Sequence, residues 1–227
     1  MTPAMTRVLL ITGASTGIGA ATARAAAAAG WSLGLAARSA ETLQGLAEEL
    51  GPEQVLPLPL DVADWPAQQA AVAALVERFG RLDAAFANAG LGSTAAGVEG
   101  GDLDNWRAML ETNVWGLLLT AKASLPELRK TRGRLLLTGS RAGRTAIRGS
   151  VYGATKWFVH GLAANVMDEM KEWGGSCTII APGMTDTPFF DSPKPDALEP
   201  ADVARAVLYA LEQPARVGVG EVYLVPR

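Results

Sequence analysis

The stretch TGASTGIG at residues 12–19 follows the apolar run VLLI at residues 8–11 and leads into an Ala-rich segment, residues 19–29. An unbroken apolar run is typical of a strand buried on both faces, and Ala favours a helix. Glycines in the turn between them let the backbone approach a diphosphate, and the helix start offers it free N–H groups. The spacing is G-x-x-x-G-x-G instead of the commoner G-x-G-x-x-G, so an ordinary glycine-rich turn is the alternative. The strand–turn–helix context favours a dinucleotide-binding turn.

The remainder of the chain repeats this alternation of short apolar runs and longer helical patterns. Strands are predicted at residues 7–12, 31–37, 55–60, 84–87, 134–138, 177–181 and 221–225. Helices are predicted at residues 19–29 and 41–50, from Asp64 onward, and at 102–130 (interrupted by Pro126), 151–173 and 200–212. Such an order predicts an α/β fold with a doubly wound parallel sheet of about seven strands and helices on both faces. No linker divides residues 1–227, so a single domain is expected.

Composition excludes several classes of function. Apolar residues make up 49% and charged residues 19% of the chain, which rules out a predominantly disordered protein. A net charge of −3 offers no electrostatic footprint for nucleic acid or for an anionic membrane. The single Cys177 and single His160 provide neither an intrachain disulfide nor a Cys/His zinc site, and no metal is expected. Without a secretory or membrane-spanning segment, a cytoplasmic protein is expected.

Tyr152 and Lys156 are four residues apart on a predicted helix and therefore lie on the same face. A tyrosine with an ordinary pKa near 10 is a poor acid–base catalyst at neutral pH, but an ammonium group one turn away favours the phenolate. The alternative is a solvated surface pair. Upstream, Ser140 follows a predicted strand, at the edge where ligands of open α/β sheets bind. Asn113 occupies the middle of a predicted helix, where asparagine is unfavourable.

Taken together, these residues resemble the short-chain dehydrogenase/reductase family over nearly the whole length, from Thr12 to residues 221–225. The shared motifs, in the family's order, are the glycines Gly13, Gly17 and Gly19, the triplet Asn88-Ala89-Gly90, Asn113 in Asn-Val-x-Gly, Ser140 before x-Ala-Gly, Tyr152 with Lys156, and Pro182-Gly183. The resemblance implies a Rossmann-type fold, a nicotinamide cofactor, a small-molecule carbonyl or alcohol substrate, and a homo-oligomer (tetramer or dimer).

The resemblance also implies roles for four catalytic residues. Tyr152 would protonate the carbonyl oxygen during reduction, or act as the base during oxidation. Lys156 would lower the pKa of Tyr152 and hydrogen-bond the nicotinamide ribose. Ser140 would hold the substrate oxygen, and Asn113 would seat a water in a proton relay to Lys156.

A larger set of residues is implied to bind the cofactor. Residues 61–62 would contact adenine, residues 88–89 would line the cleft, and residues 182–187 would grip the nicotinamide side. The full set is Gly13, Ser15, Thr16, Gly17, Ile18, Gly19, Arg38, Asp61, Val62, Asn88, Ala89, Gly90, Tyr152, Lys156, Pro182, Gly183, Thr185 and Thr187.

The chain departs from the family's pattern in three places. Ser140 precedes Tyr152 by one residue fewer than usual, which we interpret as a shortened loop because Ser140 keeps its Ser-x-Ala-Gly setting. Ala87 replaces the first asparagine of the family's common Asn-Asn doublet. The stretch between Thr187 and Pro200 is short for a substrate lid, which predicts an open pocket.

Arg38 predicts a preference for NADP(H) over NAD(H). An acidic residue after the second strand would accept hydrogen bonds from the adenosine ribose and repel a 2′-phosphate. This sequence has Leu35-Ala36-Ala37-Arg38-Ser39 there, so Arg38 can donate to the phosphate and Ser39 can add a hydroxyl. A surface arginine with dual cofactor use is the alternative.

The leading functional hypothesis is an NADPH-linked carbonyl reductase or alcohol dehydrogenase. A non-catalytic NADP(H)-binding regulator is one alternative, and an epimerase or dehydratase on the same scaffold is another. A hydrolase is disfavoured because no Gly-x-Ser-x-Gly elbow accompanies His160, which is interpreted as a helix-packing residue. The arginines at residues 141, 144 and 148 are interpreted as solvated or interfacial in preference to binding an acidic substrate.

Overall fold

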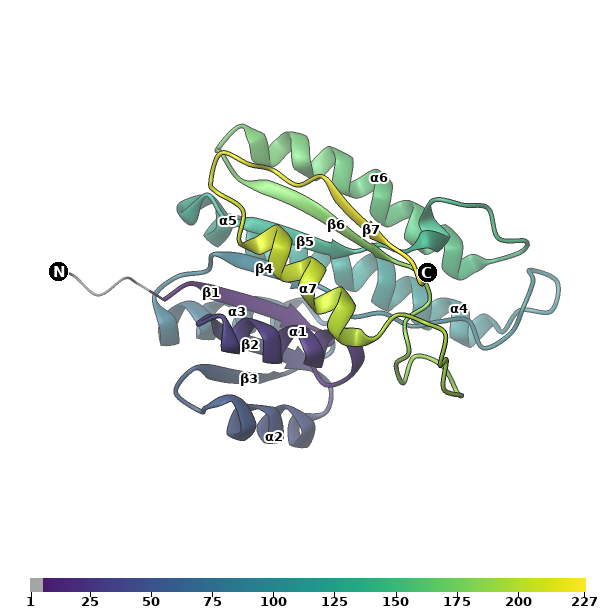
Figure 1. Ribbon diagram of the computed structural model, residues 1–227, viewed down its shortest axis with the longest axis horizontal. Coiled ribbons are helices and arrows are strands. Elements are labelled where there is room, and N and C mark those ends of the chain that lie inside the picture. Colours follow the sequence, from purple (N-terminus) through teal and green to yellow (C-terminus); the bar gives the residue numbers. More distant parts are fainter. Residues whose placement is uncertain (1–5) are drawn as a thin grey trace.

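The computed structural model describes residues 6–227, and its centre is one parallel sheet (Figure 1). The strands run in the order β3-β2-β1-β4-β5-β6-β7, and every neighbouring pair is parallel. Their bounds are β1 (Val8–Thr12), β2 (Ser32–Ala37), β3 (Val55–Pro59), β4 (Ala84–Ala87), β5 (Arg134–Thr138), β6 (Ser176–Pro182) and β7 (Glu221–Leu224). The predicted doubly wound sheet of seven strands is therefore confirmed, with strand ends within two residues of those predicted.

Helices cover both faces of the sheet. One face carries α1 (Gly17–Ala28), α2 (Ala40–Leu50) and α7 (Pro200–Leu211), and the other carries α3 (Trp65–Phe79), α5 (Leu117–Thr131) and α6 (Val151–Lys171). Alternate residues of β1 serve the two cores, with Leu9 and Ile11 facing the first group of helices and Val8 and Leu10 the second. This two-sided burial explains why the strand reads as an unbroken apolar run.

The long helical segment predicted at residues 102–130 is interrupted, but not at Pro126. Helix α4 (Leu103–Leu110) passes into a π-helical segment, Glu111–Gly116, and α5 then continues through Pro126 to Thr131. A proline removes one backbone donor and crowds the carbonyl four residues earlier. For Pro126 that carbonyl belongs to Lys122. Both residues are exposed, so water can hydrogen-bond to the freed carbonyl oxygen. The expected break at Pro126 was wrong for this reason.

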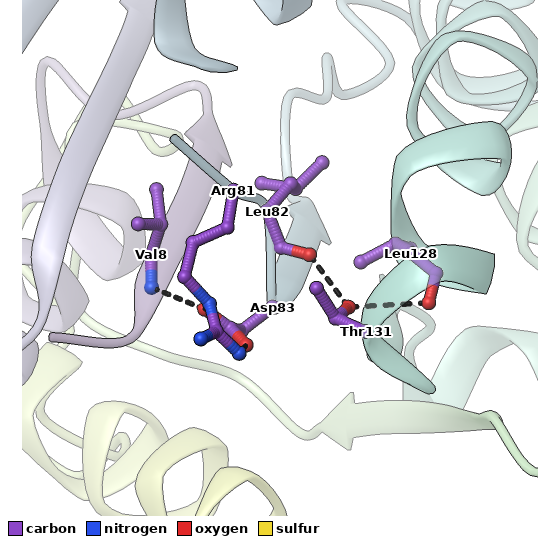
Figure 2. Close-up of polar contacts among 6 residues, drawn as sticks. All are labelled: Val8, Arg81, Leu82, Asp83, Leu128 and Thr131. Carbon is purple, nitrogen blue, oxygen red and sulfur yellow. Dashed lines mark hydrogen bonds and ion pairs between the residues drawn. The ribbon is translucent and has the colours of Figure 1, made fainter. Parts of the chain in front are cut away.

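Polar contacts fasten the amino ends of β1 and β4 to each other (Figure 2). The Val8 amide donates to Asp83 Oδ2 at 2.8 Å, and Arg81 binds the same carboxylate through Nε at 2.8 Å. The Thr131 hydroxyl, at the end of α5, donates to the Leu82 carbonyl at 2.7 Å. These bonds fix the register of β1 and β4 at the amino ends of the strands. The carboxyl ends of these strands, at the opposite edge of the sheet, are consequently held in place as well.

Within residues 6–227, no helix combines the length and the apolar character that crossing a membrane requires.

Candidate functional site

Every sequence-predicted site residue lies at the carboxyl edge of the sheet or in an element that begins there. Residues 13–19 follow β1, Arg38 follows β2, residues 61–62 follow β3, and residues 88–90 follow β4. Ser140 follows β5, while Tyr152 and Lys156 lie in the first two turns of α6. Pro182 ends β6, and Gly183, Thr185 and Thr187 come after it. Residues spread over 175 positions of sequence thus converge on one edge.

The turn after β1 needs glycine at two positions. Gly13 has a φ of +64°, and a Cβ added there would lie 2.8 Å from the Ala89 Cα atom. A Cβ at Gly19 would lie 2.1 Å from the Gly13 carbonyl oxygen, so only glycine lets α1 start this close to β1.

The start of α1 is free to bind an anion. Its N-cap residue, Thr16, makes no side-chain cap hydrogen bond, and no acidic residue occupies the first turn. Ser15, Thr16 and Gly17 line an open groove of about 860 Å³ between α1 and α2. Free N–H groups at a helix start, together with the positive end of the helix dipole, suit a phosphate or diphosphate.

Asn88 connects the three central strands at this edge. Its Nδ2 atom donates to the carbonyls of Thr12 at 3.1 Å and Gly13 at 3.3 Å. Its Oδ1 atom accepts from the Thr138 hydroxyl, at the end of β5, at 3.2 Å. The glycine turn and the start of the Ser140 segment are therefore held at a fixed separation.

Asn113 is fully buried in the π-helical segment, and its amide is already occupied. Oδ1 accepts from the Leu91 amide at 2.8 Å, and Nδ2 donates to the Leu91 carbonyl at 2.9 Å and to the Thr155 hydroxyl at 3.2 Å. The side chain therefore ties the loop after β4 to α6. Single-turn π segments are frequent at functional sites because they leave backbone groups outside the regular ladder. The water-seating role expected of Asn113 stays a prediction.

Lys156 is a buried cation, with 3% of its surface exposed. Its Nζ atom donates to the Thr138 carbonyl at 2.8 Å and lies 5.7 Å from the centre of the Tyr152 ring. Burial penalises the charged form and lowers the pKa of Lys156 to about 8. A Cβ at Gly90 would lie 3.8 Å from Nζ and 3.4 Å from Asn113 Oδ1, so both side chains face this glycine.

The pKa of the Tyr152 hydroxyl is shifted in the direction opposite to the one expected. Burial raises the pKa of its hydroxyl, and a hydrogen bond with the Ser140 side chain lowers that pKa by a smaller amount. Lys156 is not among the causes of this shift, and its ammonium group donates to the Thr138 carbonyl. The expected lowering of the Tyr152 pKa by Lys156 is therefore not found. Ser140, by contrast, does meet Tyr152.

The segment after β6 brings Phe189 to Tyr152 and Thr187 to Gly17. The Phe189 ring lies 5.6 Å from the Tyr152 ring, centre to centre, and a Cβ at Gly92 would come within 2.8 Å of it. Thr187 approaches Gly17, whose added Cβ would lie 3.0 Å from the Thr187 methyl group. Phe189 therefore packs against Tyr152, and the open pocket expected from the short segment stays a prediction. No local pattern singles out Phe189 or Gly92, since only the chain's path over the sheet brings them to Tyr152.

The remaining predicted residues lie toward β2 and β3. Arg38 is exposed directly after β2, and Ser39 caps α2 by accepting from the Thr42 amide at 3.4 Å. Asp61 is exposed and accepts from the Ala63 amide at 2.9 Å. Val62 is buried, and a Cβ at Gly116 would lie 2.6 Å from its methyl group, so it supports the π-helical segment.

Chemically, the edge combines an anion-binding helix start with a tyrosine hydroxyl, a serine hydroxyl and a buried ammonium group. This combination suits proton transfer next to a phosphate-bearing ligand. Within residues 6–227, His, Cys, Asp and Glu side chains nowhere gather in a group of three that could hold a metal ion.

Comparisons with known proteins agree on one family. The sequence model described as short chain dehydrogenase matches residues 7–197. The chain is 37% identical over 239 residues to sulfoacetaldehyde reductase 2 of Chromohalobacter salexigens, covering 98% of this chain and 95% of that protein.

Solved structures give the same result. An alcohol dehydrogenase from the archaeon Thermococcus sibiricus, complexed with 5-hydroxy-NADP, superposes with a TM-score of 0.90 at 35% identity and covers 97% of both chains. Serine dehydrogenase from Escherichia coli superposes with a TM-score of 0.88 at 30% identity, covering 96% of this chain and 97% of that one. The likeness extends over the whole sheet and its edge.

We predict that Lys156→Met stabilises the protein at neutral pH. The folded state holds Lys156 with a pKa of about 8 against an ordinary 10.5, so the unfolded state binds more protons between these values. The wild type therefore gains stability as the pH rises through that window. The difference in pKa corresponds to roughly 3 kcal/mol, and loss of the bond to Thr138 offsets part of it.

Urea unfolding at pH 7 and at pH 10.5 measures this effect. The advantage of Lys156→Met at pH 7 should be about 1–3 kcal/mol and should shrink at the higher pH. Lys171→Met, which removes an exposed lysine at the end of α6, is the control and should show little change. A Lys156→Met variant less stable than wild type at pH 7 would contradict a costly buried charge.

Proposed function

This chain belongs to the short-chain dehydrogenase/reductase family of oxidoreductases, and we propose that it is an NADP(H)-dependent enzyme that interconverts a carbonyl and an alcohol by hydride transfer. The observation that carries the proposal is the meeting of Ser140, Tyr152 and Lys156 at the carboxyl edge of the sheet, next to the anion-binding start of α1. We propose small aldehydes, ketones or hydroxy compounds as substrates.

The residues of the edge fit a nicotinamide dinucleotide. In the proposal the N–H groups of Gly17, Ile18 and Gly19 bind the diphosphate, and Ser15 and Thr16 line its groove. Asp61 and Val62 border the adenine, while Asn88, Ala89 and Gly90 border the cleft beside the ribose. Pro182, Gly183, Thr185 and Thr187 flank the nicotinamide. When bound, the nicotinamide supplies or accepts the hydride, and the protein contributes position and proton management.

Tyr152 is the proposed acid in reduction and the proposed base in oxidation. Its raised pKa keeps the hydroxyl protonated at neutral pH, so a proton is available for a carbonyl oxygen that becomes an alkoxide. Ser140 already shares a hydrogen bond with Tyr152, so a substrate oxygen bound between the two hydroxyls would receive the proton directly. Lys156 would hold the ribose and place positive charge beneath the developing oxyanion. Asn113 would keep the loop after β4 in place for this geometry.

Arg38 supports the choice of NADP(H). It is exposed beside the capped start of α2, and among the described residues it makes no ion pair or side-chain hydrogen bond that would compete for its guanidinium. The similar alcohol dehydrogenase at 35% identity was crystallised with an NADP derivative. A charge-assisted pair with the 2′-phosphate would favour NADP(H).

A homo-oligomer is the proposed assembly. An apolar groove of about 580 Å³ runs between α5 and α6, and its lining includes Leu118, Leu125, Leu162, Val166 and Trp173. Exposed aromatic residues extend both walls, Trp115 lying three residues before Leu118 and Phe158 four residues before Leu162. Exposed apolar surface of this kind favours burial against a second copy of the chain.

We expect Tyr152→Phe to abolish most turnover while leaving the fold and cofactor binding intact. The substitution removes only the hydroxyl and keeps the ring that packs on Phe189. General acid–base catalysis contributes about 10²–10⁴-fold, so kcat should fall by that order. The measurement is NADPH consumption over a panel of carbonyls, with the Kd for NADPH as the control.

The same panel separates the alternatives. A non-catalytic regulator would bind NADPH without consuming it, and an epimerase or dehydratase would convert substrate without net change in cofactor. Near-normal kcat in Tyr152→Phe would overturn the mechanism.

The double variant Ala37→Asp/Arg38→Leu is expected to reverse the cofactor preference. A charge-assisted hydrogen bond is worth roughly 1.5–3 kcal/mol, so Arg38 should favour NADPH by about 10- to 100-fold in kcat/KM. Arg216→Leu is a matched control, since that exposed arginine lies between α7 and β7, outside the site. A wild type that prefers NADH, or a double variant with an unchanged ratio, would refute the role of Arg38.

For the assembly, light scattering at micromolar concentration should report a dimer or tetramer. Phe158→Glu places a charge at an exposed position one helical turn before Leu162, which lines the apolar groove, and should shift the mass toward the monomer. Gln44→Glu adds the same charge on the exposed face of α2 and should leave the mass unchanged. A monomeric wild type is the contrary result.

A further inference from the structure

The ring of His160 packs beneath the turn that carries Ser140. His160 lies one helical turn after Lys156 on α6, and the Ser140 turn runs from Gly139 to Gly143. A Cβ at Gly139 would lie 2.9 Å from His160 Nε2, and one at Gly143 would lie 2.7 Å from His160 Cδ2. Both ends of the turn therefore rest on this ring, and neither has room for a side chain.

An ion pair holds the other side of His160. Glu221, the first residue of β7, has its Oε1 atom 4.0 Å from His160 Nδ1 and 2.9 Å from the guanidinium of Arg144. Arg144 directly follows the Ser140 turn, and its guanidinium also lies 4.7 Å from the centre of the Tyr223 ring. The last strand of the sheet thereby fastens the end of the turn. Arg144 is engaged in these contacts, which agrees with its interpretation as a loop residue and not as a ligand for an acidic substrate.

The geometry of the turn sets the direction of the Ser140 hydroxyl. The Ser140 side chain accepts from the Ala142 amide at 3.1 Å, and its carbonyl accepts from the Gly143 amide at 2.9 Å. The same hydroxyl bonds with Tyr152 and lowers the tyrosine's pKa. A change in the turn would therefore be felt at Tyr152.

Three charged groups, Arg144, Lys156 and Glu221, act on the His160 ring. Burial lowers the pKa of the ring, and the positive charges of Arg144 and Lys156 lower it further. Glu221 and the Ser140 carbonyl act in the opposite direction and raise it. Nε2 is buried without a hydrogen-bond partner of good geometry, although the Ser140 carbonyl is close enough to favour a proton there. The ring is accordingly neutral at pH 7 and serves as a packing surface with one polar edge toward Glu221.

We propose that His160 is a positioning residue for Ser140, which supports the Gly139–Gly143 turn from below while the Arg144–Glu221 pair fastens the turn to β7. The inference rests on the proposed function in that Ser140 and Tyr152 are taken as catalytic. In addition, the last strand, β7, takes part in holding Ser140 in place.

Because His160 is the only histidine in the chain, its imidazole can be followed by NMR without assignment. The proposal predicts a pKa below the ordinary 6.5 in the wild type. Glu221→Gln should lower that pKa further, since the carboxylate raises it. Arg144→Gln should raise it, because one positive charge is lost and Glu221 then faces only the ring. Glu48→Gln on the exposed face of α2 is the control and should leave it unchanged.

The second measurement is the Tyr152 pKa, taken from tyrosinate absorbance as the difference between each protein and its own Tyr152→Phe form. His160→Ala should raise this pKa by about one unit, since the Ser140 bond that lowers it is weakened. In the carbonyl panel, kcat should fall by about tenfold with the Kd for NADPH unchanged, the loss typical of a misplaced group. A purely structural role would lower the melting temperature without moving the Tyr152 pKa.

An unchanged Tyr152 pKa in a folded His160→Ala variant would overturn the proposal. A His160 pKa of 6.5 that changes in neither Glu221→Gln nor Arg144→Gln would also overturn it. If His160→Ala does not fold, these two variants provide the test. Neither titration needs turnover, so an inactive wild type would refute the proposed function while leaving this inference to be judged on its own.

Discussion

Asn88 hydrogen-bonds to both strands that flank β4, and the geometry of the site follows from those bonds. Its amide reaches the carbonyls of Thr12 and Gly13 on one side and the Thr138 hydroxyl on the other. The Thr138 carbonyl in turn accepts the Lys156 ammonium at 2.8 Å. A short series of polar contacts thus links the glycine turn after β1 to the buried cation of α6. Because backbone groups supply most of these contacts, the sheet itself sets the distances.

The site concentrates unfavourable electrostatics where chemistry is proposed. Lys156 keeps a charge in a buried position, which lowers its pKa to about 8, and burial raises the pKa of Tyr152. Both shifts destabilise the ionised forms of the two groups. They also move the two proton affinities apart, because the ordinary pKa values, 10.5 for lysine and 10.0 for tyrosine, start close together. Perturbed pKa values of this kind cluster at active sites. The surrounding apolar cores supply the stability that permits this arrangement.

Two segments from the last part of the chain complete the edge. The segment after β6 lays Phe189 against Tyr152, and β7 brings Glu221 to Arg144 and His160. The first contact packs an aromatic ring against that of Tyr152, and the second holds the turn that carries its partner Ser140. Residues 183–224, which include neither Ser140 nor Tyr152, therefore contact the Tyr152 ring and the turn that carries Ser140.

The sequence alone determined the elements and the chemistry-bearing pairs. Apolar runs such as residues 8–11 identified the strands, and the four-residue spacing placed Tyr152 and Lys156 on one face, because both patterns arise from local backbone geometry. Only the tertiary structure decided which contacts these residues make. It showed that the Asn113 amide binds Leu91, that Lys156 donates to the Thr138 carbonyl, that α5 tolerates Pro126, and that Phe189 packs against Tyr152. Each of these outcomes depends on burial and on partners distant in sequence, and local periodicity carries no information about either.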